Sequence, residues 1–155
     1  MAEPDATKEE MEAVLQKVNL LGFLQTQNGL QTELLEKAGN LSGGQCQRLV
    51  IARALLRSDS AVYIFDEAAS NIDVESEELI MNVIHELAKT KTVLLISHRL
   101  ANVVQSDQIY FLKNGTICER GTHAELMEQN GAYRHLYDSC LLYTSDAADD
   151  SLRVD

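Results

Sequence analysis

Apolar residues at helical spacing begin the chain and predict a small helical lobe. Thr7 and Glu10 fit a capping box, the pattern in which each side chain bonds the backbone N–H of the other residue. A short apolar run at 20–24 and a turn at Asn28-Gly29 follow. Apolar side chains recur every three or four residues after Thr7, as in an amphipathic helix, at Met11, Val14, Leu15 and Val18.

The middle of the chain predicts a strand, a helix and a second strand. Residues 62–65 and 92–96 are short apolar runs rich in β-branched side chains, which is typical of strands buried on both faces of a sheet. Between them, Glu75 to Lys89 carries apolar residues at helical spacing. Two strands joined through a helix run parallel. We therefore expect a parallel sheet.

The next segment predicts a β-hairpin. Residues 108–112 and 116–120 flank Lys113-Asn114-Gly115, and Asn-Gly is the strongest short hairpin signal. We expect the hairpin to form an antiparallel edge of the sheet. A helix capped by residues 121–125 and a last helix over 131–137 should follow.

Composition limits the classes of function. The chain has 155 residues, the length of one domain, and 45% of them are hydrophobic, enough for a buried core. Its net charge of −11 argues against nucleic-acid or anionic-membrane partners, which need basic surfaces. Three scattered cysteines, and the lack of a membrane-length apolar run or signal peptide, lead us to expect a soluble protein in a reducing compartment.

The stretch Leu41-Ser42-Gly43-Gly44-Gln45 carries the first candidate site. Ser42 and Gln45 fit a capping box, but that interpretation leaves the two glycines unexplained, because each costs about 1 kcal/mol relative to alanine in a helix. Glycines allow an anion such as phosphate to approach bare N–H groups at the positive end of the helix dipole. The pattern therefore predicts an anion site at the start of a helix.

The helix after this stretch, expected over residues 43–57, is apolar almost all round. Such a helix should be covered on most sides. Arg48 and Arg53 interrupt the apolar pattern. They could either reach a phosphate or bind backbone carbonyls and carboxylates, and the sequence leaves both alternatives open.

Polar residues at the ends of the two predicted strands form the second candidate site. Asp66 suits Mg²⁺, a hard cation that takes oxygen ligands, and Glu67 suits a general base that orients an attacking water. Because parallel strands end at the same edge of a sheet, His98 should lie there too, where ligands bind. The alternatives are a helix cap or ion pair for the acids and simple packing for the histidine.

These residues together resemble the motifs of the ATP-binding cassette (ABC) ATPases. Residues 41–45 resemble the signature motif, 62–67 the Walker B strand with its glutamate, 70–73 the D-loop, and His98 the switch histidine, in the order of the family. The resemblance extends from about residue 7 to residue 138.

The resemblance implies a fold and a division of the chain. The fold class is α/β: part of a P-loop NTPase core, with a parallel sheet, an antiparallel edge hairpin and a small helical subdomain. Residues 1–58 would be the remainder of the helical subdomain with the signature helix, and residues 59–138 the C-terminal part of the ATPase core. Residues 139–155 would be a foreign or disordered tail, because residues 141–155 have no amphipathic period.

The resemblance also implies roles for individual residues. In this family two ATP sites form between two cassettes, so the signature motif of one cassette closes on ATP held by the other. The implied catalytic residues are Glu67 and His98, which would act on ATP bound to their own cassette, with Mg²⁺ at Asp66. The implied ATP-binding and interface residues are Ser42, Gly43, Gly44, Gln45 and Asp73.

One motif of the family is missing. The chain contains no G-x-x-x-x-G-K-[ST], the Walker A phosphate loop. We therefore expect a truncated part of a nucleotide-binding domain that is inactive alone. Residues 97–100 and 121–126 resemble exporters whose transmembrane and ATPase domains share one chain, so the parent would be an exporter. Its ATPase domain would lie at the cytoplasmic face of the membrane. Its implied partners are a second nucleotide-binding domain and transmembrane domains. The alternatives are a soluble non-transport ABC ATPase and a non-catalytic module that completes a partner's ATP site.

Overall fold

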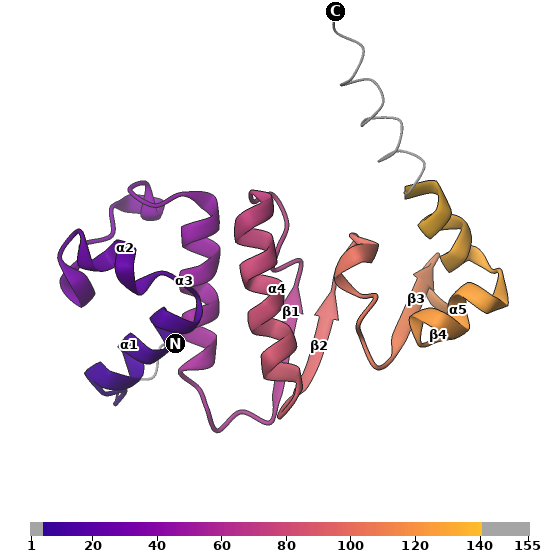
Figure 1. The fold of residues 1–155 in the computed structure, drawn as a ribbon, viewed down its shortest axis with the longest axis horizontal. Helices are drawn as coiled ribbons and strands as arrows, with labels where there is room; N and C mark the ends of the chain where they lie inside the picture. The colour runs from indigo at the N-terminus through magenta and orange to yellow at the C-terminus, as the bar shows by residue number, and fades with distance from the viewer. Residues whose placement is uncertain (1–4, 141–155) are drawn as a thin grey trace, which may run out of the picture. The chain divides into compact units, whose positions relative to one another are not determined.

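The computed structural model describes residues 5–140, and the chain divides after Ile96 into two compact units. Figure 1 shows the order of the elements along the chain. Both sides of the predicted boundary at residues 58 and 59 lie in the first unit, and the predicted division into subdomain and core stays a prediction. The predicted foreign segment, residues 141–155, lies outside the described residues.

The first unit begins with the predicted helical lobe. Both hydrogen bonds of the Thr7 and Glu10 capping box are present at the start of the first helix. Val18 and Leu20 are almost fully buried and anchor the corner between the first two helices. The helical elements are α1 (Lys8–Lys17), α2 (Leu21–Gln25), the 3-10 turns η1 (Gly29–Gln31) and η2 (Glu36–Ala38), and α3 (Gly43–Leu55).

The predicted strand, helix and strand follow as β1 (Val62–Asp66), α4 (Val74–Ala88) and β2 (Thr92–Ile96). The two strands pair in parallel, with a register that runs from Val62 opposite Thr92 to Asp66 opposite Ile96. The predicted parallel sheet is therefore confirmed. Its register places the carboxyl end of β1 beside the carboxyl end of β2.

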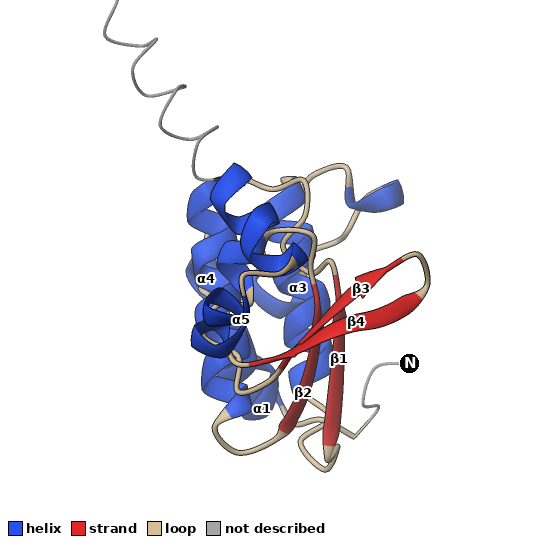
Figure 2. Ribbon diagram, turned by 90° about the vertical axis from the view of Figure 1, so that its right-hand side faces the viewer, coloured by secondary structure: helices blue, strands red, loops and turns tan. Residues whose placement is uncertain are grey.

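The prediction that these strands are buried on both faces is wrong for the described part of the chain. In β1, Tyr63 and Phe65 are buried, whereas Val62 is 55% exposed and Ile64 is 65% exposed. Helices α3 and α4 cover one face of the β1–β2 sheet (Figure 2). The apolar run gave no sign of this, because the faces of a strand are covered by elements distant in sequence.

The same difference appears on α3, which was expected to be covered on most sides. Ile51 and Ala52 are buried in the core of the first unit, but Val50 on the same helix is 56% exposed. The helix ends at Leu55, slightly before the predicted end. The described residues therefore cover only part of the apolar surface of α3.

The second unit contains the predicted hairpin and the helices after it. Asn114 and Gly115 both have positive φ, of 52° and 75°, as expected for a two-residue hairpin turn. The two strands pair only with each other, so the hairpin is a sheet of its own among the described residues, and the predicted edge position is wrong. The turn signal specifies pairing within the hairpin and carries no information about a third strand. The elements are η3 (Leu100–Asn102), β3 (Ile109–Lys113), β4 (Thr116–Gly121), α5 (His123–Gln129) and a last helix over 132–140.

A small core holds the second unit together. Tyr133, at the start of the last helix, is fully buried with Ile109 and Leu126. Its hydroxyl lies 2.8 Å from Nδ1 of His123, and burial raises the pKa of this hydroxyl above its ordinary value. Helices in residues 5–140 lack the combination of length and apolar character needed to cross a bilayer.

Candidate functional site

The start of α3 has the geometry that the sequence predicts. Ser42 is the N-cap, and its Oγ accepts a hydrogen bond of 3.2 Å from the Gln45 N–H. Gln45 Oε1 accepts one of 2.8 Å from the Ser42 N–H, which completes the capping box. Ser42 and Gly43 are exposed. Because the first N–H groups of a helix have no carbonyl one turn before them, this exposed end is where an anion could bind.

The two glycines of this turn have different surroundings. Gly44 is buried, and a Cβ placed on it would lie 2.7 Å from the Ser76 Cβ and 3.1 Å from Asp73 Oδ2. A Cβ on Gly43 would meet only the Asn71 carbonyl oxygen, at 4.0 Å. Close packing of α3 against α4 therefore explains Gly44. Sequence reasoning missed this contact, and the only available signal was that Ser76 is also small.

Asp73 has a structural task in addition to the interface role that the resemblance implies. It is the N-cap of α4, where its Oδ1 accepts a 2.8 Å hydrogen bond from the Ser76 N–H. The hydrogen bonds from the Ser76 backbone and side chain lower the pKa of Asp73, and the positive charge of Arg48 lowers it further. The structure thus brings the start of α3 and the start of α4 together within the first unit.

The pH dependence of stability tests this cap. The ordinary pKa of an aspartate is about 3.9, and a lowered folded-state pKa gives stability that is present above that value and lost as pH falls below it. We expect the Asp73→Asn variant, whose amide does not titrate there, to lose less thermal stability than the wild type between pH 5 and about pH 3. Circular dichroism melts of both proteins would measure the difference. Parallel curves would contradict it.

The acidic pair lies where β1 ends. Asp66 is the last residue of β1 and pairs with Ile96, and the Glu67 N–H donates a 2.9 Å hydrogen bond to the Ile96 carbonyl. Both acidic residues are exposed. Glu67 has a φ of +50°, a left-handed conformation that costs a non-glycine residue about 1–2 kcal/mol. Such strain is concentrated at functional sites, and nothing in the sequence predicted it.

Asp66 fits a magnesium ion only as one ligand among several. No group of three His, Cys, Asp or Glu side chains that could hold a metal occurs among residues 5–140. Mg²⁺ commonly binds one or two carboxylates and takes its remaining oxygens from water and phosphate. The single exposed carboxylate of Asp66 suits that arrangement, with a nucleotide supplying the other oxygens.

His98 lies in the loop after β2 and is exposed. Ser97 Oγ accepts a 3.0 Å hydrogen bond from the Arg99 N–H and donates one of 3.2 Å to the Arg99 carbonyl, so the residues on both sides of His98 are tied together. The prediction that both strands end at one edge is confirmed for Asp66 and Ile96. The catalytic role of His98 stays a prediction.

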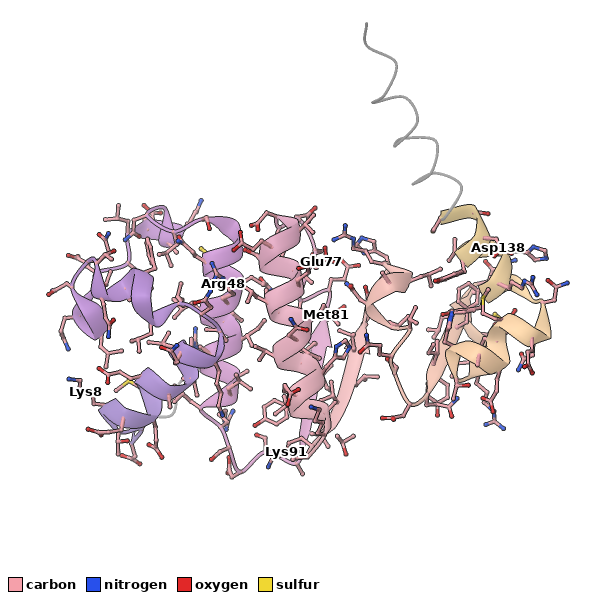
Figure 3. All side chains as sticks on the ribbon, viewed as in Figure 1. Lys8, Arg48, Glu77, Met81, Lys91 and Asp138 are labelled. Carbon is pink, nitrogen blue, oxygen red and sulfur yellow. The ribbon has the colours of Figure 1, made fainter. Side chains whose placement is uncertain are left out.

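The structure decides between the alternatives for Arg48. Its Nη1 donates a 2.9 Å hydrogen bond to the Asn19 carbonyl, and its Nε donates one of 3.3 Å to the Gly44 carbonyl. Arg48 extends from α3 toward the corner between α1 and α2 (Figure 3). It therefore binds carbonyls and fixes the first turns of α3 to the helical lobe.

A strained loop precedes the start of α3, and the sequence gave no sign of it. Lys37 and Ala38 are consecutive non-glycine residues with φ of 57° and 53°, at about 1–2 kcal/mol each. The side chain of Asn40 bridges the loop: its Oδ1 accepts a 3.1 Å bond from the Leu35 N–H, and its Nδ2 donates one of 3.0 Å to the Glu33 carbonyl.

Comparison with known proteins identifies the family. The sequence model of the ABC transporter family matches residues 2–70. An uncharacterized ABC transporter ATP-binding protein of Haemophilus influenzae is 53% identical over 137 residues, which are 88% of this chain and 24% of that protein. The chain belongs to the ABC transporter family. The family membership predicted from the motifs is confirmed.

Further matches include a flippase and an exporter. An ATP-dependent lipid A-core flippase of Mannheimia succiniciproducens is 47% identical over 132 residues, 84% of this chain and 22% of the flippase. A solved structure of a bacterial Atm1-family ABC exporter with ATP bound matches with a TM-score of 0.79 and 30% identity, over 88% of this chain and 24% of that one. The predicted α/β fold class is confirmed. The chain spans about a quarter of the length of the curated relatives it matches.

Proposed function

We propose that this ABC transporter chain supplies parts of the ATP-binding and hydrolysis sites of an exporter. The observation that carries the proposal is the exposed start of α3, where Ser42 of the signature motif is the N-cap and Gly43 is the first helical residue. The exporter likeness of the solved structure, at 30% identity, favours transport over a soluble ABC ATPase.

The start of α3 would close on ATP held by a partner cassette. The N–H groups of Gly43 and Gly44, the helix dipole and the Ser42 hydroxyl are complementary to a terminal phosphate. Gln45 supports this turn through the capping box. In this proposal Asp73 lies next to the same turn and faces the second nucleotide-binding domain.

The acidic edge of β1 would serve ATP bound to its own cassette. Asp66 would hold Mg²⁺, which neutralises phosphate charge. Glu67 would orient the attacking water and accept its proton, and His98 would bind the terminal phosphate. Because the chain contains no Walker A motif, the phosphate loop must come from residues that are not in this sequence, and we expect the chain alone to be inactive.

The exposed signature turn also supports a second function. The chain would lend this turn to an intact cassette that holds ATP. It would then act as a non-catalytic partner of a second nucleotide-binding domain. In the exporter proposal the transmembrane domains are the further partners, and the two functions share the same signature surface.

Association with an intact cassette tests the shared part of these proposals. The chain would be mixed with a cassette domain that carries its own Walker A motif, and binding would be followed by analytical ultracentrifugation with and without ATP and Mg²⁺. We expect association only with ATP, and at least about tenfold weaker association for Ser42→Arg, because a bulky cation replaces the cap hydroxyl.

The matched control is Ser58→Arg, which adds the same charge at another exposed serine of the first unit. It should bind like the wild type. Association that does not depend on ATP, or that is equal for the two variants, would contradict the proposed function.

A further inference from the structure

We propose that Asn40 is a positioning residue for the signature turn, and that it acts by holding the strained loop 33–40 in the shape that directs the chain into α3. The inference rests on the proposed function, because it concerns the orientation of the same phosphate-binding turn. It adds a residue outside the signature motif to the groups that control that turn.

The first observation is the conformation of the loop. Lys37 and Ala38 both have left-handed backbone angles, although neither is glycine. A strained conformation of this kind persists only where surrounding bonds hold it. If those bonds were lost, the two residues would relax toward ordinary backbone angles, and the path of the chain would change.

The second observation is the set of bonds that hold the loop. The Asn40 amide uses both of its ends, accepting from Leu35 and donating to the Glu33 carbonyl. The backbone adds a 2.8 Å bond from the Ala38 N–H to the Leu35 carbonyl. Asn40 is the side chain that spans the loop from its end to its beginning. It therefore fixes the distance between the two sides of the strained segment.

The third observation connects the loop to the start of α3. The Ala38 carbonyl accepts a 2.9 Å hydrogen bond from the Leu41 N–H, and it lies 3.9 Å from the Cys46 Sγ in the first turns of the helix. A rotation of the backbone at Ala38 would therefore move the residue directly before the Ser42 cap. Without Asn40, the N–H groups of Gly43 and Gly44 would lose their fixed direction although no residue of the motif had changed.

The experiment compares four forms of the full 155-residue chain: wild type, Asn40→Ala, Asn40→Ala with Ala38→Gly, and Asn28→Ala. Asn28 is the matched control, an exposed turn asparagine whose side chain makes one 3.4 Å bond, to the Gln31 carbonyl. Two quantities are measured: the Kd for the intact cassette in ATP and Mg²⁺, and amide hydrogen exchange of residues 41–46 in the chain alone.

We expect Asn40→Ala to raise the Kd about tenfold and to speed exchange of residues 41–46 by a similar factor, because two ordinary hydrogen bonds are lost. Adding Ala38→Gly should bring both values back to within about threefold of the wild type, because glycine holds the left-handed conformation without strain. Asn28→Ala should stay within about twofold of the wild type on both measures.

Three results would overturn the inference: unchanged exchange in Asn40→Ala, failure of Ala38→Gly to rescue it, or faster exchange spread equally through α4, which would indicate a general structural role. If the wild type does not associate with the cassette in ATP, the proposed function fails. The exchange measurements then still decide whether Asn40 holds the turn.

Discussion

Replacing Glu67 with glutamine is expected to lower ATP turnover about 10²- to 10⁴-fold, the usual contribution of a general base, in a cassette that contains this segment. The test protein would be the Haemophilus influenzae relative with its matching region replaced by residues 5–140 of this chain. Glutamine keeps the size and hydrogen-bonding shape of the side chain but cannot accept the proton of the attacking water. The KM for ATP should change less than about threefold, because the phosphate loop and the signature turn are intact.

Phosphate release at varied ATP concentrations measures both constants. Glu78→Gln is the matched control, because Glu78 is an exposed glutamate on α4, and it should stay within about twofold of the unmodified chimera. The 155-residue chain alone should release no more phosphate than its own Glu67→Gln form. Turnover by the chain alone, or a Glu67→Gln chimera that keeps more than about a tenth of its activity, would contradict the assigned role.

Replacing Gly44 with alanine is expected to lower the free energy of unfolding by about 1–3 kcal/mol, the usual cost of overpacking. Alanine alone favours a helix by about 1 kcal/mol over glycine, so the measured loss would understate the steric penalty. The penalty arises because the new Cβ would overlap the Ser76 Oγ and lie 2.7 Å from the Ser76 Cβ, where α3 and α4 meet. Urea unfolding followed by circular dichroism would measure it.

Gly43→Ala is the matched control, because its nearest atom outside the helix is 4.0 Å away. It should be neutral or slightly stabilising. In the Gly44→Ala background, Ser76→Gly should recover more stability than Ser76→Ala, because only the first removes the opposing Cβ. A double-mutant cycle with Ser76→Gly alone separates this recovery from the cost of a glycine inside α4. Equal stability of the Gly44→Ala and Gly43→Ala variants would contradict the packing explanation.

The pair of glycines shows how one motif can serve two physical needs. Gly43 is exposed at the positive end of α3, where an anion could reach its N–H, whereas Gly44 allows α4 to approach. In the proposed function, a side chain at Gly44 would therefore disturb ATP-dependent association through the fold. A bulky group at Ser42 would disturb the same association at the surface, with α3 and α4 still packed.

Local features of the fold could be predicted because the groups that interact lie within a few residues of one another. The capping boxes begin α1 and α3 as expected, and the Asn114-Gly115 turn closes the hairpin. The order of apolar runs also predicted the parallel pair of β1 and β2, since a strand, helix and strand in sequence is the pattern typical of a parallel sheet.

Features that depend on distant segments could not be predicted. The exposure of Val62 and Ile64, opposite the buried Tyr63 and Phe65, depends on which face of β1 the helices cover. The Asn-Gly turn predicts the hairpin but not whether a third strand pairs with it, and among the described residues none does. The predicted burial of both strand faces and the predicted edge position of the hairpin were both wrong for the same reason. The order of residues along a strand does not show which other segments pack against it or pair with it.

By itself, the sequence determined the family and the candidate chemistry, because the motifs that contain Ser42, Gln45, Asp66 and Glu67 are recognised from residue types and their spacing along the chain. Tertiary structure alone decided that Gly44 must be small and that Glu67 has a left-handed backbone where its N–H bonds to Ile96. It also decided that Asn40 closes a strained loop before the signature turn. The physical reason is that packing and strain depend on the distances between segments, which a sequence does not contain.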